Sequence, residues 1–215
     1  MELPFTTEQF LNVFAAYNTA VFPMQVVMNL LALTVIYFMF INSAMSGRLI
    51  SWILSFFWLW MGLVYHIIYF TTINTAAYIF GILFVLQGFL FIYAGAIHRK
   101  LIFRVTWNWT DIIGALFIIY ALLLYPLLGY QLGHRYPTAP TFGLPCPTTI
   151  FTFGVLLFSI KHVPRFILII PFIWSVIGFM AAFKLTIMED TGLLVAGVIG
   201  TLILYFRSDK PVPAI

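Results

Sequence analysis

The chain has 215 residues, of which 63% are hydrophobic, 19% aromatic and only 7% charged. About a quarter of the residues in an average soluble domain are charged, so this composition excludes a soluble globular protein. The net charge of +4 comes from Lys and Arg residues scattered between apolar runs, without the basic stripe of a nucleic-acid-binding protein. The single cysteine excludes a disulfide scaffold, an iron–sulfur ferredoxin and a zinc ribbon.

The first predicted element is a short helix over residues 7–18. Thr6 and Gln9 have the spacing of a capping box, and Phe5 and Phe10 have that of a hydrophobic staple. Apolar side chains then recur every three or four residues, which is the helical period. We expect this helix to lie in the outer interface of a membrane. An early start of the first membrane span is the alternative.

Seven apolar runs follow, and most are long enough for a transmembrane helix of about 20 residues. The runs cover residues 20–42, 49–71, 76–97, 111–132, 147–160, 165–183 and 191–206. The predicted fold class is therefore all-α, a polytopic membrane protein with seven transmembrane helices in a single domain over residues 1–215. The fifth run would rise only about 21 Å, short of a hydrocarbon core of about 30 Å. It must thin the bilayer, be shielded by neighbouring helices or form half of a broken helix.

The distribution of basic residues predicts the orientation of the chain. The loops after odd-numbered spans, together with the C-terminal tail, hold eight of the ten Lys and Arg residues, and the loops after even-numbered spans hold two. Basic loops stay in the cytoplasm. This pattern places the N-terminus outside and the C-terminus in the cytoplasm.

Two segments of the chain share one spacing pattern. It consists of Gly62, Asn74 and Gly81 in the first segment and of Gly178, Asp190 and Gly197 in the second. Trp58 and Trp174 each precede the first glycine by four residues. This predicts a 3+1+3 arrangement, in which two parallel three-helix units are joined by an inverting helix, as in several transporters. Coincidence is the alternative, because glycine is common in membrane helices.

Polar side chains are costly inside a membrane, so their positions indicate function. With the predicted orientation, most of them fall in the outer half of the chain, where we expect an outward-facing vestibule. The candidate substrate-binding residues are Gln25, Tyr65, His66, Gln87, Cys146, Thr148, Thr149, Glu189 and Asp190. Gln87 lies in the middle of its span, where it either lines a path or hydrogen-bonds a neighbouring helix.

Cys146 and the two threonines after it form the strongest local pattern. Pro147 fits the first turn of a helix, which puts Cys146 next to the N-cap, where the helix dipole stabilises a thiolate. Thr148 and Thr149 add hydroxyl groups, so this helix end can hold an anion or a polar substrate group. Inert packing of Cys146 is the alternative.

The acidic residues after the sixth span have two interpretations. Lys184 neutralises one of the carboxylates of Glu189 and Asp190, or the carboxylates form a proton or cation site at the outer mouth.

We expect no cofactor and no bound metal, and the catalytic residues stay unknown. A metal site would need His66 and His134 to converge with Cys146 or with the acidic residues, because no pair of ligands is spaced for a shared metal in the sequence. The chain also lacks a P-loop, a G-x-S-x-G elbow and an H-E-x-x-H motif. Whether the protein is an enzyme stays open.

Three segments of the chain together resemble a bacterial family of uncharacterised multi-pass membrane proteins. They are Pro4-Phe5-Thr6 with Glu8-Gln9-Phe10, Trp58-Leu59-Trp60-Met61-Gly62 with Tyr65-His66, and Cys146-Pro147-Thr148-Thr149. The resemblance covers the whole chain. It implies a helical fold in the bacterial cytoplasmic (inner) membrane and no particular activity.

The predicted function is that of a small-solute transporter or channel-like protein. Its expected partners are the lipid bilayer and a small-molecule solute, and no nucleic acid; a homo-oligomer stays open. One alternative is a membrane-embedded enzyme acting on a lipid or quinone, with Cys146 as nucleophile and His66 or His134 as base. Another is a membrane sensor or assembly subunit without chemistry of its own.

Overall fold

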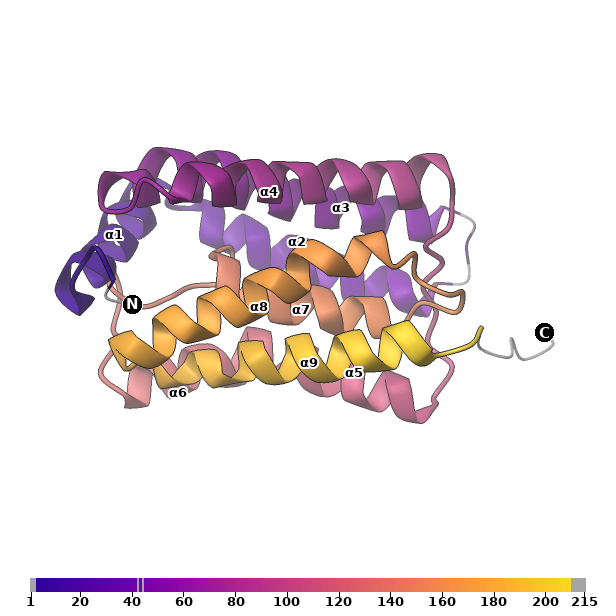
Figure 1. Ribbon diagram of the computed structural model, residues 1–215. Helices are drawn as coiled ribbons and strands as arrows, with labels where there is room; N and C mark the ends of the chain where they lie inside the picture. The colour runs from indigo at the N-terminus through magenta and orange to yellow at the C-terminus, as the bar shows by residue number, and fades with distance from the viewer. Residues whose placement is uncertain (1–2, 42, 44, 210–215) are drawn as a thin grey trace.

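The computed structural model describes residues 3–41, 43 and 45–209, and within these residues the chain is a bundle of helices without β-strands (Figure 1). This confirms the all-α class. The α-helices are α1 (Thr7–Ala20), α2 (Met24–Phe40), α3 (Ser46–Trp60), α4 (Ala77–Phe91), α5 (Trp109–Ile119), α6 (Tyr125–Gln131), α7 (Pro145–Leu157), α8 (Phe166–Leu185) and α9 (Thr191–Phe206). The π-helical segments η1 (Met61–Tyr69), η3 (Ile92–Ile97) and η4 (Tyr120–Leu124) continue α3, α4 and α5, and the short 3₁₀ turns are η2 (Phe70–Thr72) and η5 (Met188–Asp190).

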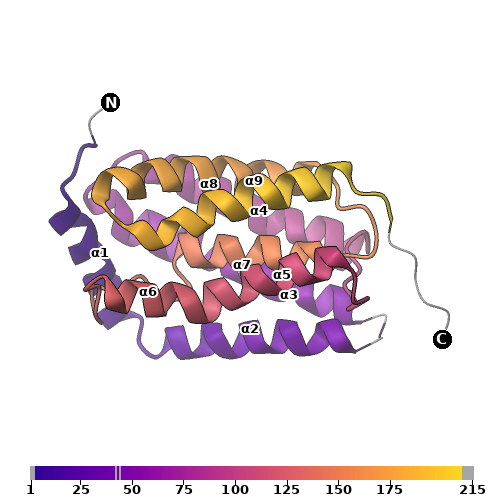
Figure 2. The ribbon, with the colours of Figure 1, turned by 90° about the horizontal axis from the view of Figure 1, so that it is seen from below.

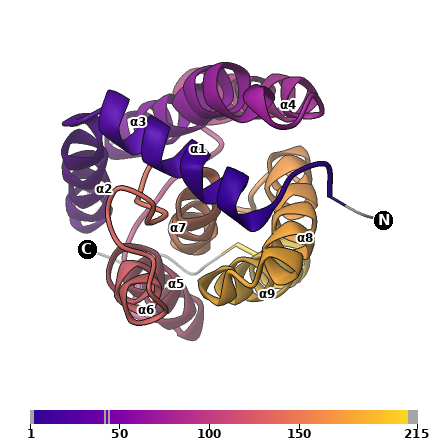
Figure 3. The ribbon, with the colours of Figure 1, turned by 90° about the vertical axis from the view of Figure 1, so that its left-hand side faces the viewer.

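Helix α1 begins as the sequence predicts. Thr6 and Gln9 form both hydrogen bonds of the capping box, and the rings of Phe5 and Phe10 stack with their centroids 5.6 Å apart. The axis of α1 makes an angle of 84° with that of α2, so α1 leaves the line of the bundle (Figure 2). It crosses one end of the bundle (Figure 3).

Five helical segments are long and apolar enough to cross a membrane, or six if the bent pair of α1 and α2 forms one span. The five are Ser46–Thr72, Ala77–Ile97, Trp109–Gln131, Phe166–Leu185 and Met188–Phe206. They match five of the predicted runs with small shifts at their ends. The prediction of seven spans is not confirmed, because α2 has 17 residues and α7 has 13.

Helix α7 lies at the centre of the bundle (Figure 3). Every residue of α7 except Cys146 is buried, and α5 and α9 pack closely against it. A Cβ added to Gly114 of α5 would lie 2.7 Å from the Gly154 carbonyl oxygen of α7, so small residues let these two backbones approach. Of the three explanations for the short fifth run, the structure supports shielding by neighbouring helices.

The predicted repeat does not produce matching packing. In the first unit, α3 packs against both α2 and α4. In the second unit all three helices contact one another, and α9 packs most closely against the other two. The 3+1+3 repeat stays a prediction from spacing.

The two ends of the bundle carry different residues. The end with the C-terminus holds the starts of α3 and α8 and the ends of η3 and α9 (Figure 1). The described basic residues in those segments and their loops are Arg48, Arg99, Lys100, Arg104, Lys161, Arg165 and Arg207. At the other end lie α1, the η5 turn with its two carboxylates, and the loop after α6.

Candidate functional site

A cavity of about 370 Å³ lies at the end of the bundle that α1 crosses. Its walls come from η1, α4, α7, α8 and the first residue before α9, and residues from α1 and the segment before it also line it. Eight of the lining residues are aromatic: Phe5, Phe10, Phe14, Tyr65, Phe70, Phe80, Tyr125 and Trp174. The other polar lining residues are Asn74, Cys146, Lys184 and Asp190.

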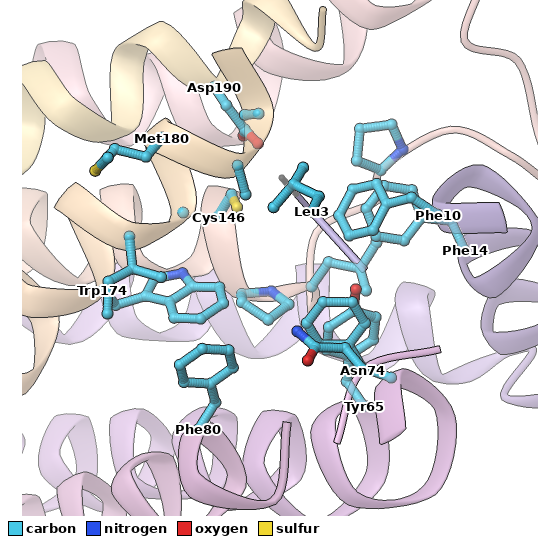
Figure 4. Close-up of a pocket in the computed structure, with 18 of the residues that line it drawn as sticks. Leu3, Phe10, Phe14, Tyr65, Asn74, Phe80, Cys146, Trp174, Met180 and Asp190 are labelled. Atoms are coloured by element: carbon cyan, nitrogen blue, oxygen red, sulfur yellow. The ribbon is translucent and has the colours of Figure 1, made fainter. Parts of the chain in front are cut away.

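Asp190 is the buried carboxylate of this cavity. It is 3% exposed and occupies the N-cap position of α9, where the helix dipole stabilises negative charge. The Tyr125 hydroxyl donates a hydrogen bond of 2.5 Å to Asp190 Oδ1, and the Cys146 thiol lies against the same carboxyl group (Figure 4). Among the described residues, no basic side chain forms an ion pair with Asp190.

Cys146 and Trp174 form the part of the wall next to Asp190 (Figure 4). Cys146 is the one residue of α7 with exposed surface, because its side chain faces the cavity. Trp174 is only 8% exposed, yet its indole N–H has no hydrogen-bond partner in the described part of the chain. The Cys146 thiol is a polar group next to this N–H.

His66 lies behind the cavity wall. Its ring packs against those of Phe84 and Trp174, with centroids 4.6 Å and 5.0 Å away. The side chain is fully buried, and neither ring nitrogen has a hydrogen-bond partner within the described residues. His66 is therefore a member of an aromatic cluster next to the cavity and is not among the residues that line it.

The other predicted polar residues of α7 face the protein interior. Thr148 Oγ1 accepts a hydrogen bond from the Gly143 amide at 3.1 Å, which holds the preceding loop against the helix. The Thr149 hydroxyl is buried without a partner among the described residues. Neither threonine lines the cavity, because only the first residues of α7 reach it.

Gln25 and Gln87 connect structural elements away from the cavity. The Gln25 amide donates to the Asn18 carbonyl at 2.8 Å, which ties the start of α2 to α1. The Gln87 amide donates to the Ile167 carbonyl at 3.1 Å, so α4 is bonded to α8. Of the two roles predicted for Gln87, the structure has the bond to a neighbouring helix.

Glu189 is next to Asp190 in sequence but has a different environment. Its Oε1 atom lies 2.6 Å from His134 Nδ1, and its side chain is fully buried. It does not line the cavity. Of the nine predicted substrate-binding residues, the structure thus brings Tyr65, Cys146 and Asp190 together.

The geometry bears on the alternatives left open by the sequence. His66 forms no hydrogen bond with Cys146, and His134 Nδ1 faces Glu189, so the Cys–His pair of the enzyme hypothesis is not formed. The described residues hold no group of three or more His, Cys, Asp and Glu side chains that could bind a metal ion.

Sequence reasoning missed Tyr125 and Trp174, and it did not connect Phe10 and Phe14 with the site. Tyr125 offered one signal, because a tyrosine well inside an apolar run needs a partner for its hydroxyl. The phenylalanines offered none. Aromatic side chains occur in lipid-facing surfaces, in protein cores and in ligand cavities, so their presence alone does not distinguish these environments.

These features define an all-helical protein with helices long and apolar enough to cross a membrane and with a cavity at one end of its bundle. The chain belongs to a family described as "Family of unknown function (DUF6064)", whose model matches residues 7–211. No curated protein and no solved structure matches the chain.

Proposed function

We propose that this protein is a small-solute transporter or channel-like membrane protein that takes up its solute through the cavity under α1. The observation that carries this proposal is a cavity of about 370 Å³, lined by aromatic rings around the buried carboxylate of Asp190. Ionisable groups inside a membrane protein mark solute or ion pathways more often than structural sites. The large exposed side chains of the spans, such as Ile82 and Phe183, are apolar and suit contact with lipid.

The orientation that we propose follows from the basic residues. Seven of the nine described Lys and Arg residues lie at the end of the bundle opposite the cavity, and basic loops stay in the cytoplasm. The cavity then opens outside the cell, and the membrane is the bacterial inner membrane.

Helix α1 is the element that controls access to the cavity in this proposal. Phe10 and Phe14 of α1 line the cavity, and Phe5 precedes them at its edge. The helix packs on the bundle through aromatic contacts, such as that of Tyr17 with Tyr65, and through hydrogen bonds that include one of 2.8 Å from Trp60 Nε1 to the Tyr17 hydroxyl. A displacement of α1 that breaks these contacts would open the cavity.

A cavity-filling substitution tests the proposal. Ala181 of α8 lines the cavity, whereas Phe183, two residues later, is 66% exposed on the outside of the bundle. We would compare uptake of labelled sugars, amino acids, carboxylates and organic amines into proteoliposomes containing wild type, Ala181→Trp or Phe183→Trp. We expect one class of solute to accumulate with wild type and Phe183→Trp but not with Ala181→Trp. Equal accumulation in all three and in empty liposomes would refute transport through this cavity.

The sole cysteine provides an independent test of sidedness. In intact spheroplasts, a small membrane-impermeant thiol reagent should label Cys146 from outside, and Ala181→Trp should slow this labelling. Labelling only after the inner side is exposed would reverse the proposed orientation.

A further inference from the structure

We infer that the cavity binds a small organic cation, an amine whose ammonium group faces Asp190 and whose apolar body lies among the aromatic rings. This inference rests on the proposed function and names the class of its solute. It is carried by three features of one cavity: a buried carboxylate without an ion-pair partner among the described residues, a wall of aromatic rings, and an indole N–H without a hydrogen-bond partner among them.

Within the described part of the chain, no basic side chain forms an ion pair with the carboxylate of Asp190. The Tyr125 hydroxyl donates to it at 2.5 Å, and the neutral Cys146 thiol lies beside it. These groups and the N-terminus of α9 stabilise the ionised carboxylate, whereas burial opposes its ionisation. Because a buried charge is costly unless it is paired, a cationic ligand would complete this site.

The neighbouring carboxylate in the same turn differs, because one of its oxygens has a basic partner. Glu189 is also fully buried, and it is paired with His134 at 2.6 Å. The chain therefore supplies a basic partner to one carboxylate of the η5 turn and leaves the other facing the cavity.

The aromatic wall suits the same ligand. Tyr65 and Phe70 stack with their centroids 5.7 Å apart, and Phe80 meets Trp174 edge to face at 5.5 Å, so faces and edges of fixed rings border the cavity (Figure 4). Ring faces attract ammonium groups and also pack against apolar groups. An anion would gain nothing from these faces.

The indole N–H of Trp174 is an independent sign of a missing ligand. It belongs to a side chain that is more than nine-tenths buried and lines the cavity, and it has no hydrogen-bond partner among the described residues. A buried donor without a partner is rare and costly. A ligand that brings an oxygen atom or an aromatic face to this side of the cavity would satisfy it.

Three probes of nearly equal shape and different charge test the inference: phenethylammonium, phenethyl alcohol and hydrocinnamate. Their binding to the purified full chain in detergent would be measured by calorimetry. The variants are Asp190→Asn, which keeps an oxygen acceptor for Tyr125, and Glu189→Gln, which removes the neighbouring charge outside the cavity. Lys184→Gln, at the exposed basic residue that lines the cavity, tests whether this lysine selects the ligand instead.

We expect phenethylammonium to bind about tenfold or more tightly than phenethyl alcohol, as close charge pairs in enclosed sites do. Asp190→Asn should remove this difference and leave the binding of phenethyl alcohol unchanged, and Glu189→Gln should preserve the difference. Equal binding of phenethylammonium and phenethyl alcohol to wild type would overturn the inference that the ligand is a cation. The cavity would then be one for apolar solutes. Tighter binding of hydrocinnamate that Lys184→Gln abolishes would overturn it in favour of an anion. If none of the probes binds wild type, both this inference and the proposed solute cavity are wrong.

Discussion

The Asn18 side chain donates a hydrogen bond of 2.7 Å to the Pro137 carbonyl, 119 residues away in sequence. The same amide nitrogen donates to the Ala139 carbonyl at 2.8 Å, and the amide oxygen accepts from the Thr141 hydroxyl at 2.8 Å. Asn18 is fully buried. One side chain thus joins α1, which crosses the cavity, to the long loop between α6 and α7.

Asn18→Ala should therefore loosen both elements. It leaves two carbonyls and a hydroxyl, all in partly buried hydrogen bonds, without their partner, so we expect the free energy of unfolding in detergent to fall by about 2 kcal/mol. Limited proteolysis should cut the 133–143 loop faster. Asn29→Ala is the control, because that amide donates only to the Gln25 carbonyl of its own helix. Equal losses for both variants would show that Asn18 does not hold the loop.

Contact between α8 and α9 depends on the lack of a side chain at Gly197. A Cβ at this position would lie 1.9 Å from Ser175 Oγ and 2.3 Å from Ser175 Cβ. Such overpacking costs about 1–3 kcal/mol, so Gly197→Ala should lower the unfolding temperature in detergent. In the Ser175→Gly background the added methyl group has room. There, Gly197→Ala should lower the unfolding temperature much less than it does in wild type. A double variant as unstable as the sum of the single variants would contradict this contact.

The capping box at Thr6 and the five long spans were predictable because their signals are local. A cap needs residues three positions apart, and a span needs only continuous apolar sequence. The central place of α7 was not predictable in the same way. Its short length was evident, but whether it faces lipid or other helices depends on contacts with α5 and α9, which are distant in sequence.

The end of the bundle at which the candidate site lies was predictable from the sequence, but only some of the residues that line it were. Tyr65, Cys146 and Asp190 line the cavity, whereas Gln25 and His66 lie at the same end but face elsewhere. Whether a side chain of a membrane helix faces lipid or the bundle is hard to derive from the sequence, because lipid and the interior of the bundle are both apolar. The hydrophobic pattern that orients helices in soluble proteins is missing here.

Arg207 caps the C-terminal end of α7. Its guanidinium donates 2.9 Å and 2.6 Å hydrogen bonds to the carbonyls of Leu157 and Ser159, where the helix has run out of its own partners. We expect Arg207→Met to cost about 2–4 kcal/mol of unfolding free energy, since hydrogen bonds to charged groups contribute more than neutral ones. Arg207→Lys should recover part of the loss, because an ammonium lacks the fork that reaches two carbonyls at once.

Arg165→Met is the matched control for Arg207. It removes one positive charge from the same end of the bundle, but its guanidinium only lies over the Tyr205 ring, 4.2 Å from the centroid. Such a contact is worth about 0.5–1 kcal/mol at an exposed site. Comparable losses for Arg165→Met and Arg207→Met would mean that the positive charge, and not the bonds to α7, stabilises the bundle.

The pair of His134 and Glu189 should behave as one unit in a double-mutant cycle. His134→Ala leaves a fully buried carboxylate without its partner at 2.6 Å, and breaking a buried pair in this way costs about 3–5 kcal/mol. In the Glu189→Gln background the same change should cost clearly less, because an amide carries no charge that needs compensation. Unfolding of wild type, both single variants and the double variant in detergent gives the coupling energy. A coupling energy of zero would mean that the His134 ring contributes only packing, and that the contrast between a paired Glu189 and an unpaired Asp190 has no energetic basis.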